Sequence, residues 1–283
     1  MRVIEDIREM RDWSEEQRLQ GKRIVLVPTM GYLHEGHLSL VRDGRRRGDR
    51  LVVSIFVNPA QFAPDEDFAR YPRDIERDRR LLEREGVHIL FQPSPEAIYP
   101  GGYQTYVDVE RLSRDLCGIY RPGHFRGVAT VVVKLFNIVC PHVAVFGLKD
   151  YQQFLIVRRL AEDLNFDIEV VGCPTVRDRD GLALSSRNEY LTQKEREAAL
   201  CLQRALRRGE DLVRQGERAA GRIVREVTAE IASEPLARIE YVRLCDPESL
   251  EVVETMRQEA LLALAVRIGK ARLIDDTILR VWS

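Results

Sequence analysis

Over its first 174 residues the chain alternates short apolar runs, rich in Val and Ile, with segments of helical periodicity. The runs that predict strands are residues 24–27, 51–57, 87–91, 143–146 and 168–171. Helical patterns lie between them at residues 73–85, 128–139 and 151–164. Nearly continuous β-branched runs are typical of strands that are covered on both faces. Strands that alternate with helices predict a parallel sheet with right-handed crossover connections.

The pattern changes after residue 174. Residues 175–187 are polar and rich in turn formers. Thr192 and Glu195 have the spacing of a capping box, which predicts the start of a long helix. The elements expected in this half are that helix through residue 213, a helix over 220–232, and strands over 239–244 and 260–268. We therefore predict an α/β protein with a Rossmann-like parallel-sheet domain at residues 1–174 and a smaller α+β domain at residues 175–283.

The charges of the chain nearly cancel. Its 283 residues include 44 basic and 45 acidic side chains, for a formal net charge of −1, which disfavours broad electrostatic binding to nucleic acid or membranes. The five cysteines form no Cys-x-x-Cys pair, as expected of reduced thiols. No apolar stretch has the length of a membrane span or the form of a signal peptide. We expect a soluble cytoplasmic protein without nucleic-acid or membrane partners.

The segment at residues 28–37, Pro-Thr-Met-Gly-Tyr-Leu-His-Glu-Gly-His, connects an expected strand to the start of an expected helix. Amide groups at a helix N-terminus favour anions, and the imidazoles of His34 and His37 add donors for a phosphate. The segment therefore predicts a nucleotide phosphate site. Zinc binding is an alternative, although the spacing differs from His-Glu-x-x-His and no thiolate or third ligand is near. Two ordinary polar loop residues are the other alternative.

Two further polar segments, residues 58–62 and 147–150, also follow expected strands. Ligands of open parallel sheets bind at the carboxyl ends of strands, so all three segments are expected at one edge. Lys149 has the character of a point charge for β- and γ-phosphates, with a surface lysine as the alternative. Three roles stay open for Asp150: capping the next helix, holding a ribose hydroxyl, or reaching Mg²⁺ through water.

Other candidate residues lie in loops or carry amides. Ser185, Ser186 and Arg187 supply hydroxyls and a guanidinium suited to a departing pyrophosphate. The amides of Gln61, Gln153 and Asn58 suit a small polar acid, although each alone is more often a structural hydrogen-bonding residue. In the Gly- and Pro-containing loop at residues 121–127, His124 and Arg126 are interpreted as structural, and the role of Arg121 stays open.

Taken together, these segments resemble the pantothenate synthetase (pantoate–β-alanine ligase) family. The motifs that carry the resemblance are residues 28–37, Phe-Val-Asn-Pro-x-Gln-Phe at 56–62, Tyr-Pro-Arg at 71–73, Arg-Pro-x-His-Phe-x-Gly-Val at 121–128, Phe-Gly-x-Lys-Asp-x-Gln-Gln at 146–153 and Asp-Gly-Leu-Ala-x-Ser-Ser-Arg-Asn at 180–188. The histidine motif alone recurs in other nucleotidyltransferases and in class I aminoacyl-tRNA synthetases, whereas the ordered set is specific. The departures are Ala60 in place of Thr and Asp178 in place of Glu.

The resemblance implies an ATP-dependent condensation of D-pantoate with β-alanine through a pantoyl adenylate, with release of pyrophosphate and then AMP. It implies ATP contacts by Met30, Gly31, Tyr32, Leu33, His34, Glu35, Gly36, His37, Gly147, Leu148, Lys149, Asp150, Val176, Leu184, Ser185, Ser186 and Arg187. Among these it gives catalytic roles to His34, His37, Lys149 and Arg187. It implies that Gln61, Gln153 and Asn58 bind pantoate or β-alanine. It also implies Mg²⁺, with ligands largely from the ATP phosphates and water, a homodimer, and a C-terminal domain that closes over the active site.

Three alternatives remain at this stage. One is another adenylyl-transferring enzyme of the same superfold, which would be distinguished by the acceptor that supports pyrophosphate release. A second is a non-catalytic ATP-binding module, against which the intact histidines and Lys149 argue. RNA binding is the third, and the near-neutral charge disfavours it. Kinship of fold by itself does not establish function.

Overall fold

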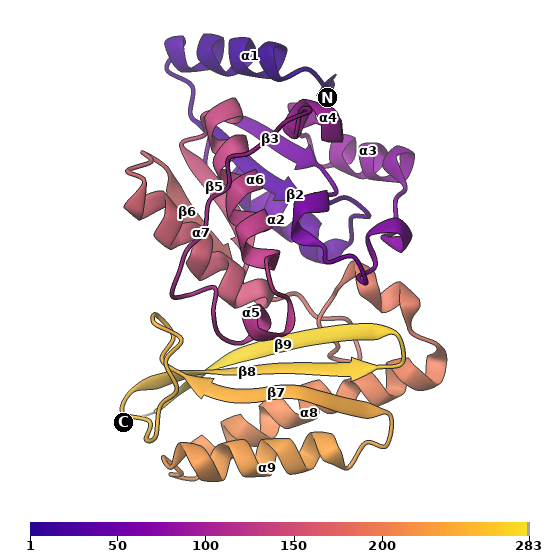
Figure 1. Cartoon of the computed structure of the whole chain (residues 1–283), viewed down its shortest axis with the longest axis vertical. Helices are drawn as coiled ribbons and strands as arrows, with labels where there is room; N and C mark the ends of the chain where they lie inside the picture. The colour runs from indigo at the N-terminus through magenta and orange to yellow at the C-terminus, as the bar shows by residue number, and fades with distance from the viewer. Residues whose placement is uncertain (282–283) are drawn as a thin grey trace. The chain divides into compact units, whose positions relative to one another are not determined.

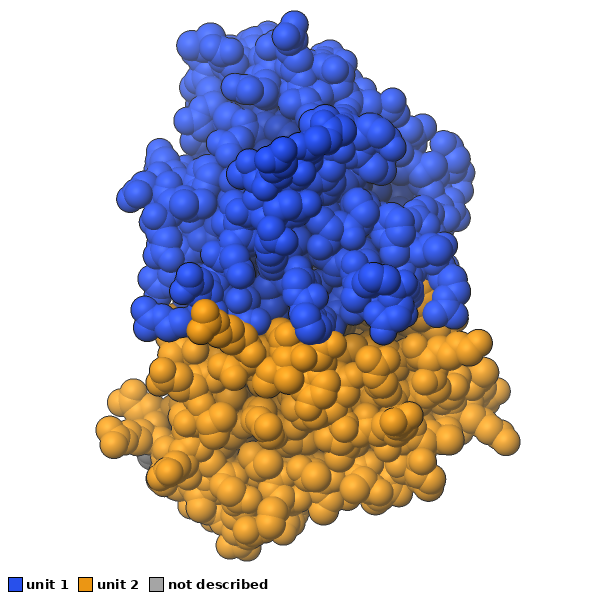
Figure 2. All heavy atoms as spheres, in the orientation of Figure 1, with its two compact units in different colours: residues 1–113, 121–148, 153–174 blue, residues 114–120, 149–152, 175–283 orange. Residues whose placement is uncertain are grey.

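The structure of the chain, a computed structural model, describes residues 1–281 (Figure 1). These residues form two compact units (Figure 2). Unit 1 comprises Met1–Ser113, Arg121–Leu148 and Gln153–Pro174, and unit 2 comprises Arg114–Tyr120, Lys149–Gln152 and Thr175–Ser283. Among the described residues, no helix is both long and apolar enough to cross a membrane.

The apolar runs of unit 1 form a six-stranded parallel sheet, which confirms the predicted fold class (Figure 1). Its strands are β1 (Arg2–Ile4), β2 (Ile24–Thr29), β3 (Arg50–Ile55), β4 (Ile89–Phe91), β5 (Val143–Gly147) and β6 (Glu169–Cys173), in the order β1-β4-β3-β2-β5-β6. Each predicted strand forms, within two residues at either end. The three-residue β1 was not predicted, because so short a run has no readable periodicity.

Helices cover both faces of this sheet. The α-helices that lie wholly or mostly in unit 1 are α1 (Ile7–Leu19), α2 (Glu35–Arg45), α3 (Ile75–Arg84), α4 (Pro95–Ile98), α6 (His124–Val139) and α7 (Tyr151–Asp163). Short 3₁₀ helices are η1 (Pro59–Gln61), η2 (Phe68–Arg70) and η3 (Leu148–Asp150). Alternate residues of β2 and β3, such as Val25 and Val53, form one buried core with Leu40 of α2 and Leu82 of α3. Helices α1 and α6 contact each other and β2.

The strand order places a topological switch point in the middle of the sheet. From β2 the chain proceeds outward through β3 to β4, and from β5 it proceeds in the opposite direction to β6. Strands β2 and β5 are direct neighbours, with Val25 opposite Val143 and Leu26 opposite Ala144. Ligands of open α/β sheets bind at such a point, outside the carboxyl ends of the strands. The segments that follow β2, β3 and β5 therefore begin at one edge.

Unit 2 contains a three-stranded antiparallel sheet and two long helices. Its elements are α5 (Cys117–Tyr120), η4 (Ser186–Tyr190), α8 (Gln193–Arg214), α9 (Ala220–Ala232), β7 (Ala237–Cys245), β8 (Glu259–Ile268) and β9 (Ala271–Arg280). Thr192 and Glu195 form the predicted capping box of α8. The sequence reading missed β9, whose apolar pattern is interrupted by Asp275 and Asp276. Helices α8 and α9 pack on the sheet over a common apolar core.

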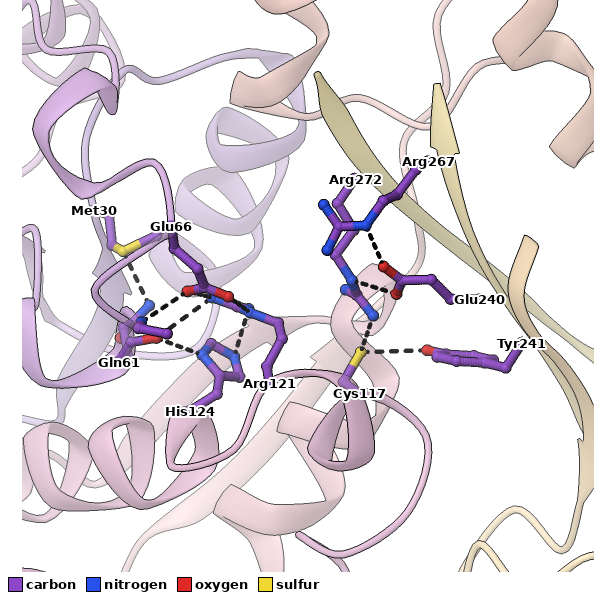
Figure 3. A network of polar contacts seen from close by, with 11 residues as sticks. Met30, Gln61, Glu66, Cys117, Arg121, His124, Glu240, Tyr241, Arg267 and Arg272 are labelled. Atoms are coloured by element: carbon purple, nitrogen blue, oxygen red, sulfur yellow. Dashed lines mark hydrogen bonds and ion pairs between the residues drawn. The ribbon is translucent and has the colours of Figure 1, made fainter. Parts of the chain in front are cut away.

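Two short segments that precede the C-terminal half in sequence also belong to unit 2. In residues 114–120, the thiol of Cys117 lies 3.2 Å from the Tyr241 hydroxyl and 3.5 Å from a guanidinium nitrogen of Arg272 (Figure 3). In residues 149–152, Gln152 accepts a hydrogen bond from the Cys117 backbone N–H at 3.0 Å. It also donates to the Asp115 carbonyl at 2.7 Å. These bonds join the start of α7 to α5.

Candidate active site

The segment at residues 30–37, which runs from the end of β2 through the first turn of α2, is called the histidine loop below. Its turn uses left-handed backbone conformations at Gly31, with φ +81°, and at Tyr32, with φ +50°. A Cβ at Gly31 would lie 2.9 Å from Ile55 and 3.1 Å from the Asp78 carboxylate, so glycine is required by both conformation and space. The turn therefore has one compatible residue at its most strained position.

Asp78 of α3 holds this turn through hydrogen bonds to its backbone. Its two carboxylate oxygens accept hydrogen bonds from the backbone N–H groups of Tyr32, at 2.7 Å, and Leu33, at 2.8 Å. The residue is 1% exposed, and burial raises the pKa of its carboxyl although both amide bonds lower it. Sequence reasoning missed Asp78. The signal that marks it is an acidic residue in register with the apolar positions Ile75 and Leu82 of the same helix.

The two histidines lie at the start of α2, as the sequence predicts. His34 is the N-cap residue, and its backbone N–H donates to Nδ1 of His37 at 3.3 Å. The two rings are 4.0 Å apart between centroids. Because Nδ1 of His37 accepts this bond, a neutral His37 carries its proton on Nε2 and is a hydrogen-bond donor there. The helix N-terminus and this N–H group together form a site suited to an anion.

Gln61, in η1 after β3, has its carboxamide orientation fixed by buried neighbours. Asn58 is 1% exposed, and its Nδ2 donates to Oε1 of Gln61 and to the Gly127 carbonyl, both at 3.0 Å. Oδ1 of Asn58 accepts from the Tyr99 hydroxyl at 2.8 Å. Because a carbonyl can only accept, the Gly127 contact identifies the nitrogen of Asn58 and hence the oxygen of Gln61. The Nε2 of Gln61 then donates to the Met30 sulfur at 3.1 Å, a weak acceptor.

Arg121, just before α6, and His124, the first residue of that helix, contact the backbone of the same glutamine (Figure 3). Nδ1 of His124 lies 2.9 Å from the Gln61 carbonyl oxygen, and its Nε2 lies 3.0 Å from Nη1 of Arg121. Arg121 also forms an ion pair with Glu66. The Arg126 guanidinium instead lies over the Tyr106 ring, at 3.9 Å from its centroid. The sequence left the role of Arg121 open; in the structure its guanidinium contacts neighbouring side chains of unit 1.

The remaining unit 1 candidates lie at the carboxyl end of β5. Gly147 is the last residue of that strand, and Leu148 follows it in η3. Gln153 lies in the first turn of α7 and is half-buried. These positions agree with the predicted sheet edge.

In unit 2, Lys149 is half-buried and Asp150 is exposed. Burial raises the pKa of Asp276 well above its usual range, the Asp275 carboxylate raises it further, and the Lys149 ammonium lowers it. Asp275 itself is 2% exposed, and its two carboxylate oxygens accept hydrogen bonds from Nη1 and Nη2 of Arg177, at 2.6 and 2.8 Å. Lys149 therefore lies within the electrostatic influence of an acidic pair, of which Asp275 is buried and Asp276 half-buried.

The loop at residues 176–187, called the serine loop below, begins as a small hairpin. The backbone N–H of Leu184 donates to the Val176 carbonyl at 3.0 Å, and the backbone N–H of Asp178 donates to the Leu182 carbonyl at 2.8 Å. The Ser185 hydroxyl then caps η4 by accepting from the Arg187 backbone N–H at 3.2 Å. Ser186 is buried at 6% exposure, and the side chain of Arg187 is half-buried. The predicted residues Val176, Leu184, Ser185, Ser186 and Arg187 thus share one ordered segment.

Protein ligands for a metal ion are scarce in the part of the chain that the structure describes. Residues 1–281 contain no group of three or more His, Cys, Asp or Glu side chains arranged to hold a metal. The zinc alternative for the histidine loop therefore has no support from a third ligand in this range. Magnesium commonly uses substrate phosphates and water with few protein ligands, so its association with a nucleotide does not require such a group.

Comparisons with known proteins agree on one family. A family model described as pantoate-beta-alanine ligase matches residues 2–278. The pantothenate synthetase of Heliobacterium modesticaldum is 59% identical over 281 residues, which cover 99% of this chain and 100% of that protein. The crystal structure of pantothenate synthetase from Thermus thermophilus superposes with a TM-score of 0.93 at 46% identity and covers 100% of both chains. Pantoate-beta-alanine ligase from Francisella tularensis, crystallised with beta-gamma ATP and beta-alanine, has a TM-score of 0.82 at 32% identity and covers 98% of this chain and 97% of that one.

Proposed function

The chain belongs to the pantoate-beta-alanine ligase family, an enzyme family that condenses pantoate and β-alanine with ATP, and from that premise we propose a reaction in two steps. In the first step a pantoate carboxylate oxygen bonds to the α-phosphorus of ATP, the bond to the bridging oxygen breaks, and pyrophosphate leaves. In the second, the β-alanine amine bonds to the acyl carbon of pantoyl adenylate, the acyl–oxygen bond breaks, and AMP leaves. The amine nitrogen releases a proton as the amide forms. No side-chain nucleophile is required.

His34, His37 and the N-terminus of α2 are proposed to stabilise negative charge at the α-phosphate. The observation that carries this role is the bond from the His34 N–H to Nδ1 of His37, because it fixes an N–H donor at Nε2. Donors that are held in place before the reaction stabilise developing charge without reorganisation. The backbone of residues 30–36 is proposed to line the nucleotide beside them.

The pyrophosphate end of ATP is assigned to residues of unit 2. Lys149 is proposed to neutralise the β- and γ-phosphates as a point charge. Ser185, Ser186 and Arg187 are proposed to bind the departing pyrophosphate, and the ordered cap at Ser185 supports this role. Gly147, Leu148, Asp150, Val176 and Leu184 are proposed as further nucleotide contacts. In this proposal the C-terminal domain closes during the reaction, so that both sets of residues act on the same ATP.

Pantoate is assigned to Gln61 and Gln153, with Asn58 as a supporting residue. The contacts of Asn58 give Gln61 a defined donor end at Nε2, which suits a hydroxyl or carboxylate oxygen of the acid. Asn58 itself uses both ends of its amide within the protein. We therefore propose that Asn58 acts mainly by orienting Gln61.

Several further features are proposed from the family resemblance alone. Mg²⁺ is proposed to arrive with ATP, held by phosphate oxygens and water and contributing charge neutralisation. A homodimer is proposed as the working assembly, and the cytoplasm as its compartment. Neither assignment affects the roles of the residues above.

The test is pyrophosphate release from Mg-ATP with D-pantoate, first without and then with β-alanine. We expect release that depends on pantoate, and continued turnover with AMP only when β-alanine is present. Substitution of His37 by Ala should slow pyrophosphate release about 10²–10³-fold. The matched control is His142→Ala, because Nδ1 of His142 also accepts a backbone N–H, that of Ile24 at 3.0 Å, at the opposite end of β2. Release that is independent of pantoate would refute the adenylate route, and equal rates in both variants would refute the role of His37.

A further inference from the structure

We propose that Arg121 and His124 are positioning residues for pantoate: they hold the backbone of Gln61 so that its carboxamide stays oriented toward the substrate. The inference rests on the proposed role of Gln61 as a pantoate ligand. All residues concerned lie in unit 1 and meet through hydrogen bonds that can be followed in Figure 3. This role accounts for two residues that the reaction scheme leaves unused: Arg121, which lies between η1 and α6, and His124, the first residue of α6.

The contacts of His124 define its protonation state. The Gln61 carbonyl oxygen, 2.9 Å from Nδ1, can only accept, so Nδ1 carries a proton. The Arg121 guanidinium, 3.0 Å from Nε2, can only donate, so Nε2 presents its lone pair. The imidazole is therefore neutral, in the Nδ1–H tautomer. A guanidinium on one ring nitrogen and a carbonyl on the other select this form.

Arg121 is itself held rigidly. Its Nε and Nη2 bond to the two oxygens of Glu66 at 2.6 and 2.8 Å, a paired geometry that fixes the plane of the guanidinium. The side chains are 11% and 21% exposed, so solvent screens the pair only partly. The remaining Glu66 contact, from the Ala63 N–H at 3.2 Å, ties the ion pair to the chain just after η1. Nη2 of Arg121 also approaches the Gln61 carbonyl at 3.4 Å.

Gln61 is thus restrained at both ends. The carbonyl of its backbone accepts from His124 and Arg121, and its side-chain oxygen accepts from Asn58. The only further partner that the structure gives its Nε2 within the described residues is the weak acceptor Met30. Restraint of this kind lowers the conformational entropy lost when a ligand binds, so its removal should weaken pantoate binding before it affects ATP.

The imidazole can be dissected with two substitutions. In His124→Asn the side-chain amide places an N–H at the position of Nδ1, because both atoms are attached to Cγ. In His124→Gln the amide lies one bond farther out, at the position of Nε2, and the donor to the Gln61 carbonyl is lost. We expect His124→Gln to raise the KM for D-pantoate about tenfold, the value of one good hydrogen bond, and His124→Asn to retain it within about threefold. The KM for ATP should stay within about twofold in both.

Two further variants make the test specific. His88→Gln is the control for an exposed histidine with a structural contact, because Nδ1 of His88 accepts the N–H of Leu51 at 3.0 Å, at the start of β3. In the Gln61→Ala background, His124→Gln should add no further increase in pantoate KM, because His124 acts through the side chain that is then missing. A merely structural role would instead give additive losses and change all kinetic constants together. Thermal unfolding of each variant identifies those that fail to fold.

The outcomes separate the inference from the function on which it rests. If Gln61→Ala leaves the pantoate KM unchanged, the assignment of Gln61 is wrong and the inference falls with it. If Gln61→Ala raises that KM but His124→Gln does not, the inference alone is overturned. Where the His124→Gln variant is unfolded, a pantoate KM raised about tenfold in folded Arg121→Gln supports the inference, and an unchanged value overturns it.

Discussion

Two buried aspartates, one in each unit, anchor loops that carry proposed site residues, and they do so by different chemistry. Asp78 in unit 1 accepts two consecutive backbone N–H groups of the histidine loop. Asp275 in unit 2 instead holds the Arg177 side chain at the start of the serine loop through two guanidinium bonds. Both aspartates are almost fully buried, at 1% and 2% exposure.

The difference lies in what the loop backbone can do without its anchor. The serine loop has its own hairpin bonds, such as that from Leu184 to Val176, and these do not involve Asp275. The histidine loop turns through two left-handed residues, Gly31 and Tyr32, of which the second is costly for a side chain. Asp78 stabilises that costly turn directly. We therefore expect the histidine loop to need Asp78 to keep its backbone conformation. The serine loop should keep its conformation without Asp275, which mainly holds the loop against β9.

The largest effect should come from replacing each anchor by Asn. In Asp78→Asn only one oxygen remains, and the amide NH₂ faces the second backbone N–H, so the turn shifts and His34 with it. We expect pantoate-dependent pyrophosphate release to fall about 10²-fold, because the donors at the α-phosphate lose their position. In Asp275→Asn one acceptor for Arg177 remains, and we expect at most a roughly tenfold loss. Single-turnover release of pyrophosphate measures both.

Stability provides the control for this pair. Loss of a buried acceptor should lower the free energy of unfolding by about 1–3 kcal/mol in Asp78→Asn. Asp275→Asn should cost a similar or larger amount, since Arg177 keeps its charge with a weaker partner. The comparison would be broken by an Asp275→Asn variant that is as inactive as Asp78→Asn while both remain folded.

The second prediction compares a glycine of each unit. A Cβ at Gly127 of α6 would lie 2.2 Å from the Ala60 carbonyl oxygen and 2.6 Å from the Gln61 backbone nitrogen, so helix and η1 must separate. A Cβ at Gly221 of α9 would meet nothing within 4 Å. We expect Gly127→Ala to cost about 1–3 kcal/mol of stability and to raise the pantoate KM, whereas Gly221→Ala should stabilise by about 0.4–1 kcal/mol. Denaturant unfolding and steady-state kinetics measure the two effects.

A Gly127→Ala variant with normal stability and normal pantoate KM would show that the close approach of α6 to η1 is dispensable. Equal destabilisation at Gly221 would point to a general cost of helix substitution. Either result would remove the distinction between the two helices.

The third prediction uses pH to separate the loops. Burial raises the folded-state pKa of Asp78, so its ionisation opposes folding: the stability it contributes is full below about pH 4 and declines as pH rises through the raised pKa. In the serine loop, hydrogen bonds from the Arg179 backbone and from Arg196 lower the pKa of Asp178. The contribution of Asp178 is present above about pH 4 and is lost as pH falls through the lowered pKa.

The measurement is the free energy of unfolding between about pH 3 and 7 for the parent chain, Asp78→Asn and Asp178→Asn. The parent should lose stability relative to Asp78→Asn as pH rises through this window. Relative to Asp178→Asn it should gain stability, by a small amount because Asp178 is exposed. Two differences of the same sign would contradict the assigned shifts.

Most of the fold could be predicted from the sequence because the residue types of each segment indicate which of its positions are buried. The runs that became β2, β3 and β5 are apolar and β-branched, and α9 occupies the predicted residues 220–232. Strand β9 was missed because Asp275, buried by its contact with Arg177, looks like a surface residue in the sequence. A buried ion pair between residues 98 positions apart leaves no local pattern.

The candidate site divides in the same way. The histidine motif and the segments after β3 and β5 could be placed at one sheet edge, because strand ends follow from the strands. The supports behind them could not, because Asp78 acts 45 and 46 residues away on backbone groups, which have no sequence signature. Likewise, the contact of His124 with Gln61 joins residues 63 positions apart. Site residues can be predicted from the sequence where side chains occur in a recognisable motif. Contacts of a side chain with distant backbone groups leave no such motif and are much harder to predict.

The smallest expected effect concerns the outermost support of the pantoate residues in unit 1. Tyr99→Phe removes the hydroxyl that donates to Oδ1 of Asn58 at 2.8 Å, while the Ala60 N–H, at 3.2 Å, remains as a second donor to the same atom. Because burial raises the pKa of Tyr99, the hydroxyl is a neutral donor throughout the working pH range. We expect about 0.5–1.5 kcal/mol of lost stability, roughly 1–4 °C in Tm, and a pantoate KM about two- to fivefold higher.

Tyr103→Phe is the matched control, since the Tyr103 ring packs edge-on against Tyr99 with centroids 5.1 Å apart and its loss of a hydroxyl leaves that packing intact. It should change neither the pantoate KM nor that for ATP. An unchanged pantoate KM in Tyr99→Phe would mean that Ala60 and Gly127 alone suffice to orient Asn58. In that case Tyr99 would contribute nothing to the orientation of Gln61, and the support of Gln61 through its side chain would stop at Asn58. The histidine loop, which is held by the buried carboxylate of Asp78, would then depend more strongly on a buried residue than the Gln61 segment does.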